Sequence, residues 1–470
     1  MNFRAFRYLS RFQKMNHQSK KKFVSIRKIR GSLPHMNKLL LFALCMLLAA
    51  CKQSKPSDTS KTEIQATNPE NISIENTRAK DTTIEDLRTH LSLLPANQSQ
   101  LAEQPFASTA ISKDQAEQAL ALILTDRLQT LRAARQKEHV AKSITIKHKG
   151  SDKTLRYEYI IYGKKPVDGH SLYISMHGGG GAPASVNDGQ WKNQIKLYKP
   201  AEGIYLAPRA PTDTWDLWHQ AHIDPLFDRL IENFITIEGI NPNKIYIMGY
   251  SAGGDGTYQL APRMADRWAG AAMMAGHPGD AKTYNLRNLA YFIQCGGKDA
   301  AYNRNKLAAE WGTKLDRLSM IDHGAYPHKW IVYPQYGHWM NLECKQAVPW
   351  MAKHTRNPWP KKLHWHQDNV THTRFHWLAN PDPKPNQLIT AEVEDQTITL
   401  TSDNSKLNAI TLRLSDKLLD LDKPLTVSDS QGKTLFKGKV IRTVQSIYDS
   451  IQQRPDPTSA ATATLTIKLD

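Results

Sequence analysis

The chain has 470 residues, of which 40% are hydrophobic, so it is long enough to form more than one domain. Its 62 Lys and Arg residues outnumber its 44 Asp and Glu residues, giving a net charge of +18, but eleven of the basic residues lie in residues 1–50, which contain no acidic residue. The remainder carries only +7 and shows no basic patch interleaved with aromatic residues, which argues against nucleic-acid binding.

The first fifty residues have the pattern of an export signal. Met36-Asn37-Lys38 is a short positive segment, and residues 39–48 are apolar but too few to span a bilayer as a helix. The segment ends in Leu48-Ala49-Ala50-Cys51, which resembles a bacterial lipobox. The resemblance implies cleavage before Cys51, acylation of its sulfur and export to the outer membrane, on its periplasmic or surface side; an ordinary signal peptide is the alternative. We therefore expect a leader over residues 1–50, with Met36 as the favoured start of translation.

A flexible tether is expected over residues 51–107, because residues 52–105 contain no aromatic residue and are rich in small polar residues and Lys. It would leave the chain in contact with the membrane through the N-terminal lipid only. A helix follows, since Ser112 and Gln115 have capping-box spacing and apolar residues recur at helical intervals from Ala116 to Leu131. We expect this helix to pack on the next domain; binding of a partner is the alternative.

Residues 108–355 are expected to form an α/β domain. Helical patterns separate most of its later strands, including one that Asp224 and Pro225 would open as N-cap and first helical residue. This alternation predicts a mostly parallel, eight-stranded sheet with helices on both faces. The eight predicted strands are 143–147, 154–162, 171–176, 204–207, 244–248, 269–274, 290–295 and 330–333.

Two of these strands end in glycine-rich turns. The strand at 244–248 leads into Gly249-Tyr250-Ser251-Ala252-Gly253 and then a helix, and glycines on either side would let Ser251 stand exposed in a tight turn. Ser251 as a simple helix cap is the alternative. The strand at 171–176 leads into His177-Gly178-Gly179-Gly180-Gly181. Four consecutive glycines lose much backbone entropy when the chain folds, so their presence indicates that another group must approach this backbone closely.

An acid and a histidine follow two later strands. Asp299 comes after the strand at 290–295, and His338 comes after the strand at 330–333. Serine, aspartate and histidine in this order, each at a strand end, predict a nucleophile, an orienting acid and a general base. Asp280 also follows a strand and is the alternative acid, whereas we expect His277 to be structural or to line a pocket.

These motifs resemble those of the α/β-hydrolase fold. The His-Gly-Gly-Gly-Gly loop, the Gly-Tyr-Ser-Ala-Gly-Gly turn, Gly-Gly-Lys-Asp and Tyr-Gly-His-Trp are similar to those of secreted feruloyl esterases, acetyl xylan esterases and polyhydroxybutyrate depolymerase-like enzymes. The resemblance covers residues 140–355 and implies an acyl-enzyme mechanism with Ser251, Asp299 and His338. It also implies an oxyanion hole formed by Ala252 and the turn at Gly178 and Gly179.

Aromatic residues and cysteines add less specific information. Trp215, Trp218 and His219 follow the fourth predicted strand, and with Trp339 they are the predicted substrate pocket, which would suit a sugar or an aromatic ring. Ordinary packing of each tryptophan is the alternative, and Trp191 is a weaker candidate. After removal of the leader and acylation of Cys51, only Cys295 and Cys344 remain, as free thiols or as one disulfide. The ligand spacings and glycine patterns that hold metals or organic cofactors are missing from the sequence, so we expect neither.

Residues 356–470 are expected to form a separate β-rich, sandwich-like domain. Turn signals divide this part into short strands, with a hairpin turn at Gln431-Gly432. A cluster of His and Trp residues at its start, 363–377, favours packing over metal binding. The predicted strands are 391–401, 409–414, 424–427, 438–444 and 463–469.

The sequence thus predicts an exported serine esterase that acts on an ester-bearing small molecule or polysaccharide. Two alternatives stay open. One is a serine peptidase of the prolyl oligopeptidase type, although no repeat of propeller-blade length precedes the domain. The other is a surface-tethered polysaccharide-binding protein without catalytic activity. The sequence leaves the oligomeric state undetermined.

Overall fold

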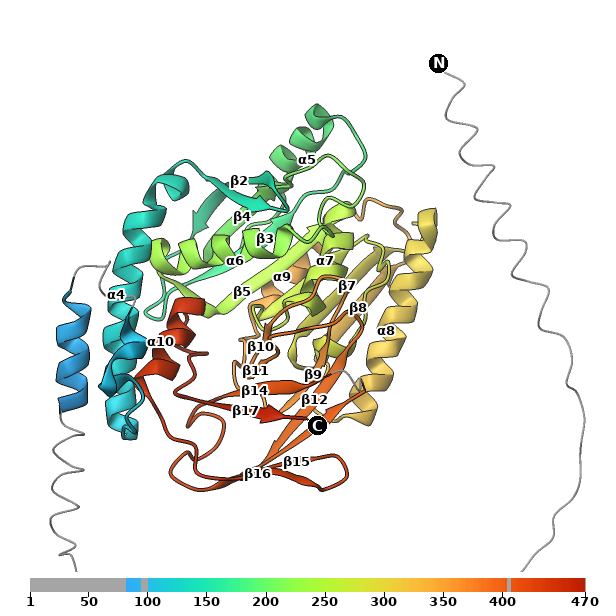
Figure 1. Cartoon of the computed structure of the whole chain (residues 1–470). Helices are drawn as coiled ribbons and strands as arrows, with labels where there is room; N and C mark the ends of the chain where they lie inside the picture. The colour runs from blue at the N-terminus through green and yellow to red at the C-terminus, as the bar shows by residue number, and fades with distance from the viewer. Residues whose placement is uncertain (1–81, 94–99, 404–406, 470) are drawn as a thin grey trace, which may run out of the picture. The chain divides into compact units, whose positions relative to one another are not determined.

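A mostly parallel sheet forms the centre of the molecule, in a computed structural model that describes residues 82–93, 100–403 and 407–469 (Figure 1). Its order is β1-β2-β4-β3-β5-β6-β7-β8, and β2 pairs antiparallel with both neighbours. This order is that of the α/β-hydrolase fold, so the predicted fold class is confirmed. Every predicted strand is present: β1 (Ser143–His148), β2 (Ser151–Tyr162), β3 (His170–Met176), β4 (Gly203–Arg209), β5 (Ile240–Tyr250), β6 (Gly270–Met274), β7 (Ala290–Gly296) and β8 (His328–Tyr333).

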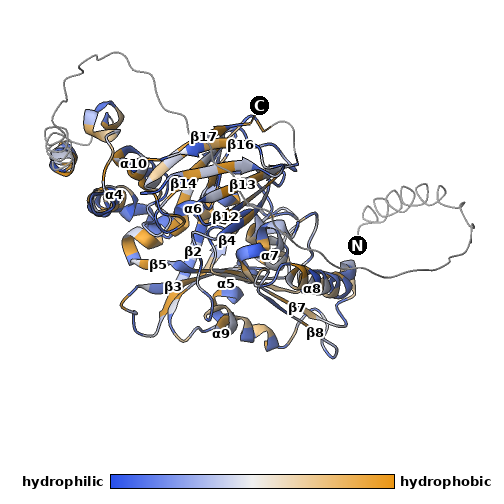
Figure 2. Cartoon of the chain, turned by 90° about the horizontal axis from the view of Figure 1, so that it is seen from below, coloured by the Kyte–Doolittle hydropathy of each residue, from blue (hydrophilic) through white to orange (hydrophobic). Residues whose placement is uncertain are grey.

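The two faces of the sheet are covered by different helices. Along β5, Ile245 and Ile247 point into one buried cluster while Tyr246 and Met248 point into another, as the alternation of side chains along a strand requires. Helices α6 (Ile223–Asn233), α7 (Ala252–Arg263) and α8 (Arg304–Ile321) contribute to the first cluster. Helices α5 (Ala184–Leu197) and α9 (Ala347–Met351) lie against the second. Helix α8 carries both hydrophilic and hydrophobic residues in Figure 2.

The start of α6 differs from the prediction. The helix begins at Ile223 with His222 as N-cap, so Asp224 and Pro225 lie inside its first turn. Asp224 is buried and cannot be a solvated cap, because it accepts two hydrogen bonds from Arg263 and one from His372. The proposed capping role of Asp224 is therefore wrong, and the residue instead joins α6 to α7.

The C-terminal part contains two packed sheets, as predicted. One has the order β10-β11-β14-β17 and the other β16-β15-β13-β12-β9. The hairpin at Gln431-Gly432 joins β15 to β16, but the predicted strand 391–401 is two strands that turn at Asp395. The strands are β9 (Lys362–His366), β10 (Arg374–Phe375), β11 (Leu378–Ala379), β12 (Leu388–Glu394), β13 (Thr397–Ser402), β14 (Ala409–Leu414), β15 (Leu425–Asp429), β16 (Thr434–Gly438) and β17 (Ala463–Lys468).

One predicted strand in this domain is absent. Of residues 438–444, only Gly438 lies in a strand, as the last residue of β16, and α10 (Val444–Gln453) begins at the other end, capped by the Thr443 hydroxyl, which accepts from the Ser446 amide. Val444, Ile447 and Ile451 form the buried face of α10. This face packs against α4 (Lys113–Val140), which carries the predicted capping box at Ser112. Helix α4 therefore contacts the C-terminal domain as well as the hydrolase sheet.

The predicted flexible tether is wrong for its last part. Residues 82–91 are helical, and Ile84 and Leu87 are buried in the same cluster as α4 and α10. Leu101 and Ala107, in two short 3₁₀ turns (Leu101–Glu103 and Pro105–Ala107), are buried there too. The few apolar residues of this segment are thus enough to dock it on an existing surface, although they could not form a core alone. The predicted leader, Cys51 and the rest of the tether lie outside the described residues.

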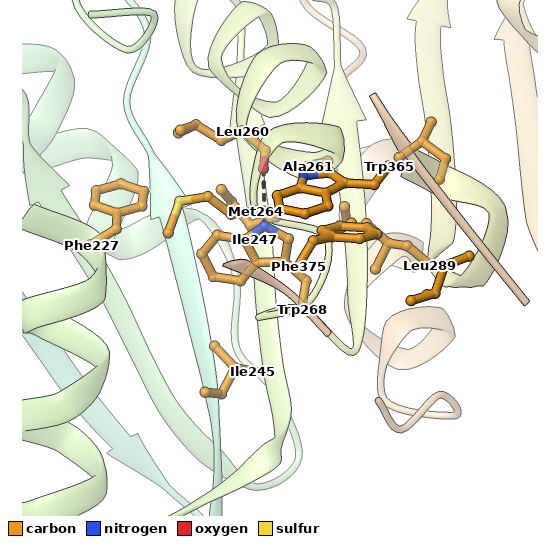
Figure 3. Packing of buried hydrophobic residues seen from close by; sticks show 14 of the residues in the cluster. Phe227, Ile245, Ile247, Leu260, Ala261, Met264, Trp268, Leu289, Trp365 and Phe375 are labelled. Atoms are coloured by element: carbon orange, nitrogen blue, oxygen red, sulfur yellow. Dashed lines mark hydrogen bonds between the residues drawn. The ribbon is translucent and has the colours of Figure 1, made fainter. Parts of the chain in front are cut away.

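One apolar core joins the hydrolase to the C-terminal domain. Trp365 and Phe375 of that domain stack with ring centroids 5.9 Å apart and belong to the same buried cluster as Trp268, Leu260 and Ala261 of the hydrolase (Figure 3). The Trp268 indole donates to the Leu260 carbonyl at 3.0 Å. The described residues all fall in one compact unit, so the boundary near residue 356 is a change of architecture and not a flexible junction.

Among the described residues, no helix has both the length and the apolar character needed to cross a membrane.

Buried ion pairs add to this interface and yield a stability prediction. Asp266 follows α7, is buried, and pairs with Arg454 of the C-terminal domain, which holds the pKa of its carboxyl far below the usual range. We expect Asp266→Asn to lower the free energy of unfolding by about 3–5 kcal/mol, because it leaves a buried guanidinium without its carboxylate. Chemical denaturation would measure this. Asp420→Asn is the control, since Asp420 pairs with Lys423 at the surface and its replacement should leave stability nearly unchanged. Equal stability of both variants would contradict the argument.

Candidate active site

Ser251 occupies a strained turn between β5 and α7. Its φ of 58° and ψ of −121° lie in a region that costs a non-glycine residue about 1–3 kcal/mol. The turn is held by close packing around it, because a Cβ atom on Gly253 would overlap the Met176 carbonyl, and one on Gly249 would overlap Gly253. Only glycine fits at these two positions. The packing therefore forces the Ser251 side chain away from the sheet and toward the loops that follow the other strands.

His338 and Asp299 meet Ser251 at this edge. Nε2 of His338 lies 2.9 Å from the Ser251 Oγ, and Nδ1 lies 2.8 Å from Asp299 Oδ2. An ionised carboxylate only accepts hydrogen bonds, so Nδ1 carries the proton and Nε2 accepts from the serine hydroxyl. The Asp299 side chain is 2% exposed and the His338 side chain 44% exposed, so the acid is buried while the imidazole faces the solvent.

Tyr250 fixes the histidine loop from the residue next to Ser251. Its hydroxyl donates to the His338 carbonyl at 2.6 Å and accepts from the Met340 amide at 3.0 Å. Burial is the main reason that the pKa of Tyr250 is raised far above its usual value, so the hydroxyl remains a donor. Ser251 and His338 are thus held in register through one side chain.

The glycine loop after β3 is held by a buried, neutral histidine. Burial lowers the pKa of His177 to about 4. Its Nε2 accepts from the Ala210 amide at 3.1 Å, so its Nδ1 donates to the Gly178 carbonyl at 2.6 Å. Asn187 accepts from the Gly180 amide at 3.0 Å on the other side of the loop. A Cβ atom on Gly178 would lie only 3.2 Å from the Ser251 Cβ, which shows how closely this backbone approaches the serine.

A cavity of about 460 Å³ opens beside Ser251. Helix α5 contributes three amides and an ammonium group to its lining, and Tyr250 and Trp339 contribute aromatic rings. Gly178 and Gly179 form its edge next to the serine, and Ala252 is the first residue of α7, where backbone amides are free of helical acceptors. The residues from α5 are Gln190, Asn193, Gln194, Lys196 and Leu197.

The four predicted pocket residues have different positions. Trp339 lines the cavity and is 50% exposed. Trp215 is 59% exposed but lies outside this cavity, next to Gly181. Trp218 is fully buried and donates to the His177 carbonyl at 3.0 Å, and the His219 carbonyl accepts from Arg263. The prediction of a pocket role is therefore wrong for Trp218, which is fully buried and holds the glycine loop through the His177 carbonyl, and His219 does not line this cavity. Trp191, which donates to the Ala207 carbonyl, does not line the cavity either.

The alternative acid and the second histidine lie apart from the serine. Asp280 accepts from the Gln259 amide at 3.0 Å, and His277 Nδ1 accepts from the Gly279 amide at 3.0 Å. Neither has a hydrogen bond to Ser251 or His338 in the part of the chain that the structure describes. The geometry therefore favours Asp299 over Asp280 as the partner of the histidine.

Tyr302 and Arg304 border the site and were missed in the sequence. The Tyr302 ring lies 5.8 Å from that of Trp215, and the Arg304 guanidinium lies 4.8 Å from the Tyr302 ring and 3.8 Å from Asp299 Oδ1. Tyr302 and Asn303 both have positive φ, of 56° and 58°, which is rare for such residues. Their position just after Asp299 is the one signal that could have indicated them.

Asp255 is a second buried carboxylate close to the site. It lies in the first turn of α7, its backbone amide donates to the Ser251 carbonyl, and its side chain accepts from the His277 amide at 2.6 Å. Burial raises the pKa of Asp255 to about 6, although the His277 amide and the positive Arg304 oppose the shift.

The two remaining cysteines do not form a disulfide. Cys295 and Cys344 are free and buried; Cys295 contacts Asp299 at 3.9 Å and Cys344 contacts the Tyr198 hydroxyl at 3.1 Å. Burial raises the pKa of Cys295 to about 12 and that of Cys344 to about 11, so both are thiols at neutral pH. No group of three or more His, Cys, Asp or Glu side chains is placed to hold a metal ion within residues 82–93, 100–403 and 407–469.

Comparison with known proteins finds only remote similarities. No protein-family model matches the chain, and no curated protein matches its sequence. Among solved structures, a thermostable esterase is 17% identical, with a TM-score of 0.33. The match covers 46% of this chain and 62% of the esterase chain. A feruloyl esterase module from Clostridium thermocellum, in complex with sinapinate, is 15% identical, with a TM-score of 0.33. The match covers 45% of this chain and 86% of the module. FphF, a fluorophosphonate-binding serine hydrolase from Staphylococcus aureus, is 15% identical, with a TM-score of 0.31. The match covers 45% of this chain and 97% of the FphF chain. At such identities and TM-scores, similarity does not assign an activity.

The raised pKa of Asp255 predicts a pH-dependent gain in stability on its neutralisation. Its folded pKa of about 6 exceeds the ordinary value of 3.8, so ionisation of Asp255 destabilises the fold increasingly as the pH rises from 4 to 6. We expect Asp255→Asn to stabilise the protein by about 2–3 kcal/mol at pH 8 and by little at pH 4. Thermal unfolding at both pH values measures this. A stability difference that is the same at both pH values would contradict it.

Proposed function

We propose that the chain is a serine hydrolase that cleaves carboxylic esters through an acyl-enzyme. The observation that carries the proposal is the unbroken chain of hydrogen bonds from Ser251 through His338 to Asp299, at 2.9 and 2.8 Å, at the edge of a cavity. Each member comes from the end of a different strand of a rigid sheet, and a strained turn holds the nucleophile. A histidine so placed can remove the serine proton as the oxygen attacks a carbonyl carbon.

The proposed mechanism uses each group once in each half-reaction. As the Ser251 oxygen bonds to the ester carbon, its proton passes to His338 Nε2, and buried Asp299 stabilises the resulting imidazolium. The carbonyl oxygen becomes an oxyanion, for which the amide of Ala252 and those of the turn at Gly178 and Gly179 are the proposed donors. His338 then protonates the departing alkoxide, leaving the acyl-enzyme. A water molecule then attacks the acyl carbon and gives its proton to His338, and His338 passes this proton to the Ser251 oxygen as the acyl–oxygen bond breaks and the carboxylic acid leaves.

The lining of the cavity supports a substrate with both a flat apolar face and polar groups. Trp339 and Tyr250 offer aromatic surface, and the amides of Gln190 and Asn193 on α5 offer hydrogen bonds. Such a lining fits esters linked to plant polysaccharides, or polyester-like substrates. An exported lipoprotein acylated at Cys51, in the outer membrane, would meet substrates of this kind outside the cytoplasm. A peptide nitroanilide as an additional substrate separates esterase from peptidase activity.

Replacement of the triad tests the proposal directly. We expect Ser251→Ala and Asp299→Asn each to lower kcat for p-nitrophenyl acetate by at least about 10⁴-fold, because the first removes the nucleophile and the second the acceptor that fixes the histidine tautomer. Asp280→Asn is the matched control and should retain activity, since Asp280 accepts from Gln259 and has no hydrogen bond to Ser251 or His338 among the described residues. A fluorophosphonate probe should label wild type and not Ser251→Ala. Absence of both turnover and labelling in wild type would reject the serine hydrolase.

The role of Trp339 in substrate binding gives a second test. We expect Trp339→Ala to raise KM for methyl ferulate by up to about tenfold, through loss of aromatic stacking, with a smaller effect on p-nitrophenyl acetate. Trp191→Phe serves as the control, because Trp191 binds Ala207 and does not line the cavity. An equal change for both substrates, or an equal effect of both substitutions, would argue against a pocket role for Trp339.

A further inference from the structure

Six buried charged residues meet where the C-terminal domain packs on the hydrolase. All six are less than 9% exposed, and arginines outnumber aspartates by four to two. Arg356 pairs with Asp456 at 2.5 Å, and Arg454 pairs with Asp266. This leaves two guanidinium groups without a carboxylate. The six residues, called here the interface charge cluster, are Asp266, Arg356, Arg374, Arg413, Arg454 and Asp456.

Arg374 and Arg413 have only neutral acceptors among the described residues. Arg413 donates to the His376 carbonyl at 3.0 Å and to the Ser450 hydroxyl at 2.5 Å. Arg374 donates to Gln453 and Ser459, while its buried Nε has no acceptor among the described residues. Neither forms an ion pair within the ranges that the structure describes. The cluster therefore holds two buried positive charges in excess.

This excess is electrostatically unfavourable. Burial and the neighbouring Arg454 lower the pKa of Arg413 to about 9, and burial and Arg413 lower the pKa of Arg374 well below its usual value. His376, also in contact with the cluster, is neutral near pH 7 because burial lowers its pKa to about 4. A bound anion would relieve this repulsion by placing a negative charge next to a guanidinium.

A cavity of about 290 Å³ gives access to Arg413 from the surface. Arg413 and Thr464 are directly opposed in the β14–β17 pair, so their side chains lie on the same face of the sheet. Ser446, Ser450 and Gln453, spaced four and three residues apart, line the cavity from one face of α10. The cavity thus combines a buried guanidinium with hydroxyl and amide donors, the groups that bind oxyanions.

We propose that this cavity binds a small oxyanion group (phosphate, sulfate or carboxylate), with Arg413 as its charged partner. The anion is either free in solution or part of an acidic polysaccharide, since both present the same chemistry. Asp449 also lines the cavity, but it is exposed and accepts from Gln445. Its carboxylate would repel the anion and weaken binding. Removing this charge should therefore strengthen binding, whereas removing a hydrogen-bond donor should weaken it.

The test measures thermal unfolding and calorimetric binding on the full chain, at constant ionic strength with chloride as the reference. Phosphate and sulfate probe the free anion, and galacturonate and polygalacturonate probe a carboxylate on a sugar. The proposal predicts a saturable rise in Tm with at least one of them. Binding of phosphate or sulfate alone identifies a free anion, and stronger binding of polygalacturonate than of galacturonate identifies a polymer.

Surface variants keep the test independent of folding. We expect Thr464→Val to raise Kd by up to about tenfold, through loss of one hydrogen bond to a charged group, and Asp449→Asn to lower Kd by about threefold or more, through loss of a repelling charge. Thr397→Val, on an exposed position of β13, is the matched control and should not change Kd. None of these residues lies in the proposed esterase site, so turnover should stay unchanged. Absence of saturable binding, or identical binding by wild type and both cavity variants, would overturn the proposal.

Discussion

The site depends on the close contact between the backbones of β3, β5 and α7 around Ser251. This contact requires glycine at 249 and 253, and it places Ser251 in a left-handed conformation that the chain would not adopt by itself. Because the sheet and helix are buried on both sides, the cost of the turn is met by packing that is already present. The same contact brings Gly178 against Ser251. Nucleophile and glycine loop are therefore set by one piece of packing, and the histidine joins them through Tyr250.

Local patterns were enough to predict the sheet and the candidate triad. The strands are short apolar segments bounded by turns, and Ser251, Asp299 and His338 each follow one of them, so topology alone brings them to one edge. The burial of Trp218 could not be predicted from such local patterns. The Trp218 indole is buried, and its N–H donates to the carbonyl of His177, which lies forty-one residues earlier in the sequence. Trp339, in an equally aromatic loop, stays exposed. Which tryptophan faces a ligand is decided by such distant contacts.

Helix α10 and residues 82–107 show a second limit of prediction from local sequence patterns. Val444, Ile447 and Ile451 have helical spacing, but a preceding run of β-branched residues made a strand the natural interpretation. The segment at 82–91 looks too polar to fold. Each becomes stable only because α4, α10 and this segment bury their few apolar residues against one another. Sequence composition predicts whether a segment can form its own core, and it does not predict docking on a surface made elsewhere.

The position of the interface charge cluster limits what an anion bound there can be. Arg356 in this cluster binds Asn243, near the start of β5, whereas Ser251 follows the end of the same strand. Tyr250 lies seven residues further along the strand than Asn243, a distance of about 23 Å at the rise of an extended chain. An anion near this end of the sheet therefore cannot touch the ester bond that Ser251 attacks. To influence hydrolysis it would have to belong to a long substrate that reaches both ends of the sheet, whereas a free ion would act on the stability of the interface alone.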